Sequence, residues 1–149
     1  MSQSLPWNEP KRPPIQIKKK KLESAFWRTL KKALQTTKPQ WALTRLESWA
    51  ALGVPDVMIN ADGKLLLLEL KVCHATKVKL SPHQISFAQS HKSAPVWIVV
   101  NAGYSDREYI AVYAASQALD LAEQGVALSP KLLLHKPFDW IQFTNLINT

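Results

Sequence analysis

The spacing of apolar and polar residues along the chain predicts helices alternating with strands. Apolar side chains recur at helical spacing over residues 22–35, and basic side chains occupy the opposite face. Further on, short apolar runs bounded by turn-forming residues predict strands at 40–47, 54–60, 64–72, 96–100 and 108–113. Later helices are predicted at 81–91 and 116–124, followed by a short one capped by Asp139. This succession predicts an α/β fold with a mixed sheet flanked by helices, in which 96–100 adds parallel to 64–72.

The strongest local signal is a β-hairpin centred on Asp62 and Gly63, a residue pair that favours a two-residue turn. With those residues at the turn, Asp56 is expected directly opposite Glu69. Lys71 has the same parity as Glu69, so its side chain points to the same face of the sheet. The hairpin therefore predicts two carboxylates and an ammonium gathered on one patch.

Opposed like charges destabilise a hairpin unless something positive lies between them. The strand around Glu69 is apolar on both faces, which is typical of a central strand covered by helices. Mg²⁺ prefers oxygen ligands of this kind and supports phosphoryl transfer. The alternative is structural: Asp56 caps a turn, while Glu69 and Lys71 are ordinary charges at a strand edge.

Pro55 and Asp56, followed after the turn by Glu69, Leu70 and Lys71, resemble the signature of the PD-(D/E)XK nuclease superfamily. The resemblance is specific from about residue 45 to residue 100. It implies a restriction-endonuclease-like mixed sheet flanked by helices, and metal-dependent cleavage of nucleic acid. It also implies metal binding by Asp56, Glu69 and the Leu70 carbonyl, with Lys71 acting on the attacking water.

The segment from Leu80 to Gln84 resembles the Ser-Pro-x-Gln that follows the catalytic lysine in small phage nucleases and VRR-NUC-like domains. This resemblance makes Gln84 an accessory residue of the active site, or a phosphate contact.

Members of this superfamily commonly carry one more acidic residue on the first helix, and two residues compete for that place. Glu23 lies on the inward side of the predicted helix, one turn before Phe26. The structural alternative is that Glu23 only favours the helix N-terminus. Glu47 is the rival, because Arg45 and Glu47 match an Arg-x-Glu pattern of similar phage nucleases.

The formal charge of +8 lies entirely in the N-terminal quarter of the chain. Residues 1–38 contain ten Lys/Arg and two Glu, whereas residues 39–149 carry nine residues of each sign. Such asymmetry predicts a polyanionic partner. Residues 1–17 are predicted to be a flexible, proline- and lysine-rich arm, and 18–149 a single nuclease domain. The residues expected to contact nucleic acid are Lys18, Lys19, Lys20, Lys21, Arg28 and Arg45.

Other features narrow the class of protein. Cys73 is the single cysteine, so no internal disulfide is possible and a cytoplasmic setting is expected. No apolar run is long enough to span a membrane, and no signal-peptide core is present. The sequence has no Gly-x-Ser-x-Gly motif, which disfavours an acyl hydrolase.

The expected function is a DNA endonuclease that uses Mg²⁺, with Mn²⁺ as a substitute. The chain is similar in size and layout to phage enzymes that resolve Holliday junctions, in which a homodimer cuts opposed strands. That resemblance implies selectivity for branched DNA and an intracellular, phage-encoded origin in a bacterial host. Two alternatives stay open: a VRR-NUC-like flap or end nuclease, and a catalytically silent nucleic-acid-binding protein of the same fold.

Overall fold

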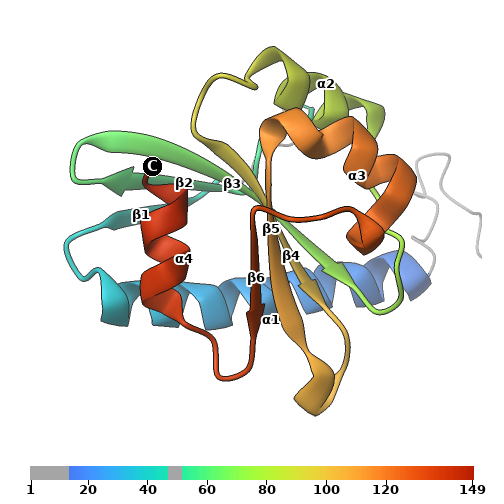
Figure 1. Ribbon diagram of the computed structural model, residues 1–149, viewed down its shortest axis with the longest axis horizontal. Coiled ribbons are helices and arrows are strands. Elements are labelled where there is room, and N and C mark those ends of the chain that lie inside the picture. The colour runs from blue at the N-terminus through green and yellow to red at the C-terminus, as the bar shows by residue number, and fades with distance from the viewer. Residues whose placement is uncertain (1–13, 47–51) are drawn as a thin grey trace, which may run out of the picture.

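The chain forms a mixed sheet with helices on both faces, as the computed structural model shows (Figure 1). The structure describes residues 14–46 and 52–149, with the backbone alone described for 14–21. Within these ranges six strands lie in chain order across the sheet. The strands are β1 (Ala42–Arg45), β2 (Val57–Ala61), β3 (Lys64–Cys73), β4 (Val96–Ala102), β5 (Tyr109–Ala114) and β6 (Leu132–His135). The α-helices are α1 (Pro14–Thr37), α2 (Pro82–Ser90), α3 (Ala118–Gln124) and α4 (Trp140–Ile147).

The predicted hairpin is confirmed, and its register holds for residues 57–61 against 64–68. Ala61 pairs with Lys64, and Val57 pairs with Leu68 at the far end of the antiparallel ladder. The turn residues Asp62 and Gly63 have φ values of 54° and 95°, the left-handed conformation that an Asp-Gly pair tolerates. The predicted parallel pairing of β3 with β4 is also confirmed, and α2 forms the crossover between them.

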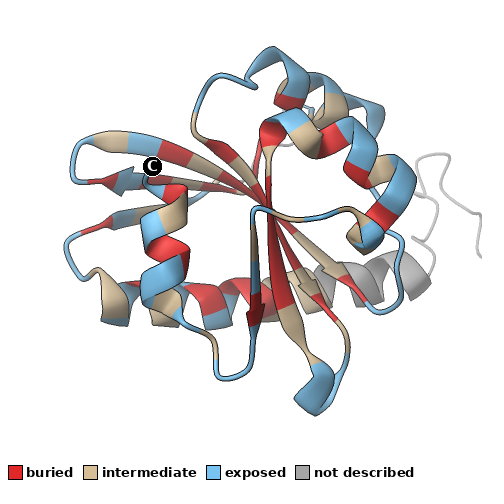
Figure 2. Cartoon of the chain, in the orientation of Figure 1, coloured by how far each residue is buried: buried red, intermediate tan, exposed pale blue. Residues whose placement is uncertain are grey.

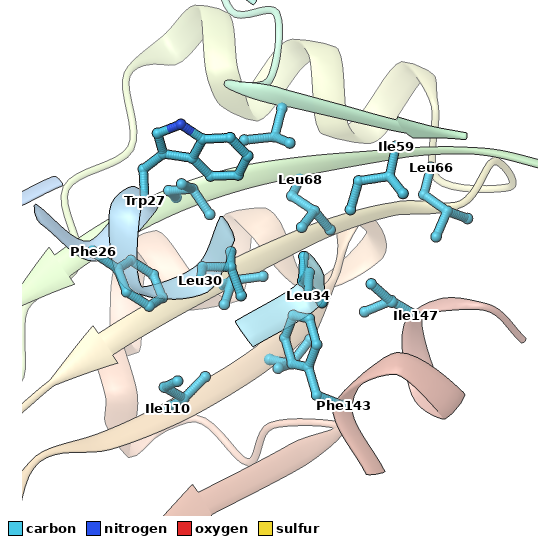
Figure 3. Packing of buried hydrophobic residues seen from close by; sticks show 14 of the residues in the cluster. Phe26, Trp27, Leu30, Leu34, Ile59, Leu66, Leu68, Ile110, Phe143 and Ile147 are labelled. Atoms are coloured by element: carbon cyan, nitrogen blue, oxygen red, sulfur yellow. The ribbon is translucent and has the colours of Figure 1, made fainter. Parts of the chain in front are cut away.

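Helices cover the two faces of the sheet in pairs. On one face, Leu30 and Leu34 of α1 pack with Leu66 and Leu68 of β3, and Phe143 of α4 joins the same cluster (Figure 3). Full burial of a leucine side chain contributes roughly 1.5–3 kcal/mol, so this face holds α1 firmly in spite of its charged outer side.

The opposite face carries α2 and α3. Ala88 of α2 and Leu121 of α3 are buried with Ile98, Val100 and Tyr113 of the sheet. The central strands are therefore buried on both sides (Figure 2). This burial explains the unbroken apolar run in β3 that the sequence shows.

Helix α1 begins at Pro14, which corrects the predicted boundaries at the N-terminus. The sequence predicts that residues 14–17 belong to a flexible arm, but their backbone is helical in the structure. Proline suits the first helical position, and the lysines that follow are good helix formers. The predicted arm is otherwise outside the described residues.

Three further elements differ from expectation. Strand β1 covers Ala42–Arg45, where a strand over 40–47 was predicted, and residue 47 lies outside the described residues. The strand begins late because the chain bends at Trp41, whose indole N–H donates to Asp62 at 3.2 Å. The short strand β6 was not predicted. Helix α3 is preceded by a 3₁₀ turn at Ala115–Gln117 in place of the predicted first α-turn. Across the described ranges, no helix combines the length and apolar character that crossing a membrane requires.

Candidate metal centre

The site lies where β3 extends beyond the end of its antiparallel neighbour, β2. The ladder between β2 and β3 stops at Val57 and Leu68, whereas β3 continues to Cys73 along β4. The Leu70 N–H is thereby left to donate to Oδ2 of Asp56, at 2.9 Å. Because the N–H and C=O of a strand residue point to the same side, the Leu70 carbonyl also turns toward this uncovered edge.

Asp56 reaches the site in a different way from the one predicted. A turn at residues 62 and 63 predicts that Asp56 pairs with Glu69. Asp56 instead lies in a bend before β2, so the two residues are not paired in the ladder. Proline has no N–H to donate to a ladder, and Pro55 marks the point where the regular strand cannot extend backward. The two carboxyl groups nevertheless interact. A hydrogen bond between them lowers the pKa of Asp56 and raises the pKa of Glu69.

Gly53 fixes the segment that precedes Asp56 against α2. Its φ is +86°, and a Cβ at this position would lie 2.3 Å from the carbonyl oxygen of His83. Only glycine permits so close an approach of two backbones. The bend that carries Asp56 and the first turn of α2 are thus held together.

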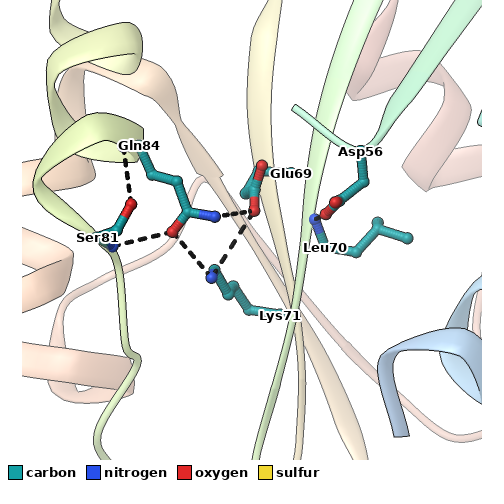
Figure 4. Close-up of polar contacts among 6 residues, drawn as sticks. All are labelled: Asp56, Glu69, Leu70, Lys71, Ser81 and Gln84. Atoms are coloured by element: carbon teal, nitrogen blue, oxygen red, sulfur yellow. Dashed lines mark hydrogen bonds and ion pairs between the residues drawn. The ribbon is translucent and has the colours of Figure 1, made fainter. Parts of the chain in front are cut away.

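Gln84 links the charged residues of β3 to α2 (Figure 4). Its Nε2 donates to Oε1 of Glu69 at 2.7 Å, and its Oε1 accepts from Nζ of Lys71 at 3.0 Å. Lys71 also lies 3.7 Å from the Glu69 carboxylate. Glu69 and Lys71 thus lie on the same patch of sheet, and Gln84 joins them from α2.

The same glutamine completes the N-terminal cap of α2. Its backbone N–H donates to Oγ of Ser81 at 3.1 Å, and its side-chain Oε1 accepts from the Ser81 N–H at 2.9 Å. This reciprocal arrangement is a capping box, with Pro82 at the first helical position as predicted. The cap fixes the side chain of Gln84 before any ligand is present.

Burial raises the pKa of both carboxyl groups, and like charge adds to the effect at Glu69. The pKa of Glu69 rises to about 9, chiefly because of burial, and next because of the negative charge of Asp56. Glu23 raises it further, whereas Lys71 lowers it. Burial also raises the pKa of Asp56, against the lowering effects of the Leu70 N–H, Lys71 and Arg45. Ionisation of the two carboxyl groups is therefore costly in the metal-free site, and a bound cation would favour their charged forms.

A cavity of about 190 Å³ opens beside these residues. Glu23 of α1 and Gln84 of α2 both line it, although the two helices cover opposite faces. The cavity therefore extends around the edge of β3 that β2 leaves uncovered. Glu23 lines this cavity, while its rival Glu47 lies outside the described residues, so the choice between them stays a prediction.

Two lysines of this cavity were missed from the sequence. Lys77 and Lys79 line it together with Lys71, and both are exposed. Val78 between them is buried, with 2% of its surface exposed, so the lysines project away from the core on either side of an anchor. The available signal was the Lys-x-Lys pattern between β3 and α2.

The remaining predicted contacts are less closely associated with the centre. Arg45 is exposed and near enough to Asp56 to lower its pKa, whereas Arg28 is exposed on α1. For Lys18, Lys19, Lys20 and Lys21 the structure describes backbone alone, within α1. Over the described ranges no three Asp, Glu, His or Cys side chains converge tightly enough to form a complete metal cage. The centre thus offers two carboxyl groups and a carbonyl. This small donor set suits Mg²⁺, which keeps several water ligands, better than an ion that takes all its ligands from the protein.

Comparisons with known proteins do not place this chain in a family. No protein-family model matches it, and no curated protein matches it. The residues of the site therefore provide the grounds for a function.

Proposed function

We propose that the chain is a Mg²⁺-dependent DNA endonuclease of the PD-(D/E)XK type, selective for branched DNA. The observation that carries the proposal is the contact set around Glu69, a carboxyl buried to 5% exposure with Asp56, Lys71 and Gln84 as neighbours. Burying a carboxyl group costs free energy of folding. Such groups are typical of functional sites, where a bound cation or a charged neighbour offsets that cost.

The donor set fits Mg²⁺, with Mn²⁺ as a substitute. Asp56 and Glu69 supply two carboxylates, and the carbonyl of Leu70 faces the same edge. Mg²⁺ commonly takes one or two carboxylates and fills its other positions with water and substrate phosphate. When bound, the ion supplies a Lewis acid that stabilises charge on the phosphate and favours ionisation of water.

The residues around the ion have separate tasks. Lys71 presents its ammonium beside Glu69, where it orients the attacking water and stabilises negative charge on the phosphate oxygens. Gln84 holds the ammonium and the carboxylate at fixed positions through its amide. Preorganised groups of this kind lose little free energy to reorientation during the reaction.

The lysines of the cavity supply the contact with the DNA backbone. Lys77 and Lys79 stand beside the centre, and the N-terminal quarter adds the net charge of +8. Contacts of this kind bind phosphates without reading sequence, which accords with recognition of DNA structure. A homodimer would bring two such centres to the opposed strands of a Holliday junction.

Cleavage of a four-way junction, a flap and a linear duplex, each with Mg²⁺ or EDTA, tests the proposal. Asp56→Asn and Glu69→Gln are expected to abolish cleavage and to leave DNA binding within a few-fold of the parent. Glu123→Gln, at an exposed carboxylate on α3, serves as the matched control and should cleave normally. Cleavage that survives both active-site changes would falsify the proposed centre. Junction binding by the parent without any Mg²⁺-dependent cleavage would favour the catalytically silent alternative.

A further inference from the structure

A second cavity, of about 270 Å³, adjoins the metal centre. Val72 lines both cavities, and the consecutive α1 residues Leu22 and Glu23 line one each. The second cavity lies between α1 and the ends of β3, β4 and β5. We call it the side groove; it shares Val72 with the cavity beside the centre, so the two cavities are neighbours along β3.

The side groove has an apolar wall and an aromatic rim. Phe26, Ile110 and Phe138 contribute to the wall. At the rim His74 and Tyr104 stack with ring centroids 4.4 Å apart and an interplanar angle of 8°. Tyr104 is 62% exposed, so part of its ring remains accessible to a ligand. Such a rim provides a surface on which a flat ring can stack.

The charge of the side groove differs from that of its neighbour. Among the described residues, neither lysine nor arginine lines it, and its carboxylate, Glu108, is bound to Asn101 at 2.7 Å and to Lys136 at 2.6 Å. Three lysines, in contrast, line the cavity at the centre. A phosphate is therefore favoured in one cavity, and a neutral ring with polar edges in the other.

We propose, on the basis of the nuclease function above, that the side groove receives an unpaired base next to the phosphate that is cut. A nucleotide consists of a charged and a neutral aromatic part joined by a sugar, and the two adjoining cavities have complementary properties. The volume of the groove is slightly below the roughly 300 Å³ at which pockets begin to hold drug-sized ligands, so a single base is a suitable occupant. The preferred substrate then has an unstacked base at the cut, as at a flap or an open branch point.

Binding of a single-stranded oligonucleotide containing 2-aminopurine, in EDTA, tests the groove without requiring catalysis. The parent should quench the fluorescence by stacking, and Tyr104→Ala should lose the quenching and bind at least about fivefold more weakly. Tyr104→Phe keeps the ring and should restore both. His91→Ala is the control, because His91 also stacks on an aromatic ring, Phe87, but lines neither cavity.

Cleavage in Mg²⁺ supplies an independent measurement. Tyr104→Ala should lower kcat/KM on a flap at least about fivefold and leave cleavage of a fully paired duplex unchanged. Equal quenching and equal flap cleavage by the parent and Tyr104→Ala would overturn the base site while leaving the nuclease proposal intact. An inactive parent that still quenches through Tyr104 would overturn the nuclease proposal and retain the base site.

Discussion

Replacing Glu69 by glutamine should remove a specific dependence of stability on pH. The side chain of Glu69 is 7% exposed, and its pKa is raised from 4.5 to about 9. Between these values the folded protein binds a proton that the unfolded chain has released. A raised pKa of this kind contributes stability below pH 4.5, and that contribution is lost as the pH rises toward 9.

The size of the effect follows from one proton. The free energy of unfolding should fall by about 1.4 kcal/mol for each pH unit within this window. From pH 5.5 to 7.5 the metal-free parent should therefore lose about 2–3 kcal/mol that Glu69→Gln does not lose. Glutamine keeps the size of the side chain and an oxygen that accepts from Gln84, so packing is little changed.

Urea denaturation in EDTA at the two pH values measures this difference. The four histidines are common to both proteins, so their contributions cancel in the comparison. Glu108→Gln is the control: the pKa of Glu108 is lowered by Lys136 and Asn101, so this carboxylate is ionised throughout the window in both states. The control should follow the parent. A parent slope equal to that of Glu69→Gln would refute the protonation of this buried carboxyl.

The remaining predictions concern the residues around the centre. Gln84→Ala should abolish most cleavage. Ser81→Ala should cost about 1 kcal/mol of stability through the lost cap but retain cleavage at temperatures where the turn stays closed, because the Ser81 N–H still donates to Gln84; activity and urea unfolding together measure both effects. Gly53→Ala should lower the free energy of unfolding by a few kcal/mol, because its Cβ would meet a backbone oxygen at 2.3 Å; unfolding within 0.5 kcal/mol of the parent would contradict this. Lys79→Ala should reduce the slope of log binding constant against log salt by about 1, whereas Lys92→Ala, away from the centre, should leave it unchanged.

Local chemistry made much of this fold predictable. Asp62 and Gly63 set the turn, and the turn set the register of the whole hairpin, so the face of Glu69 and Lys71 followed by parity. The cap of α2 was equally readable, because Ser81 and its proline form a short-range signal. Each of these features depends on residues within a few positions of one another.

The features that sequence did not give depend on contacts between distant segments. Asp56 lies outside the ladder because it belongs to a bend, and the turn before that bend packs on α2 where Gly53 meets His83. Strand β6 is four residues long, too short for a periodic signal, and pairs with β5 through the tertiary fold. The position of Lys77 beside Gln84 could not be predicted for the same reason, since only the packed chain brings Lys77 to the cavity.

The double duty of the Gln84 amide has a consequence for dynamics. Because one side chain both closes the first turn of α2 and ties Lys71 to Glu69, fraying of that turn disassembles the charged cluster. Helix ends open at far smaller free energy than whole domains. Heating should therefore inactivate the centre at a lower temperature than the one at which the sheet unfolds. Amide hydrogen exchange at this turn should measure the fraction of molecules in which the charged cluster is intact at a given temperature.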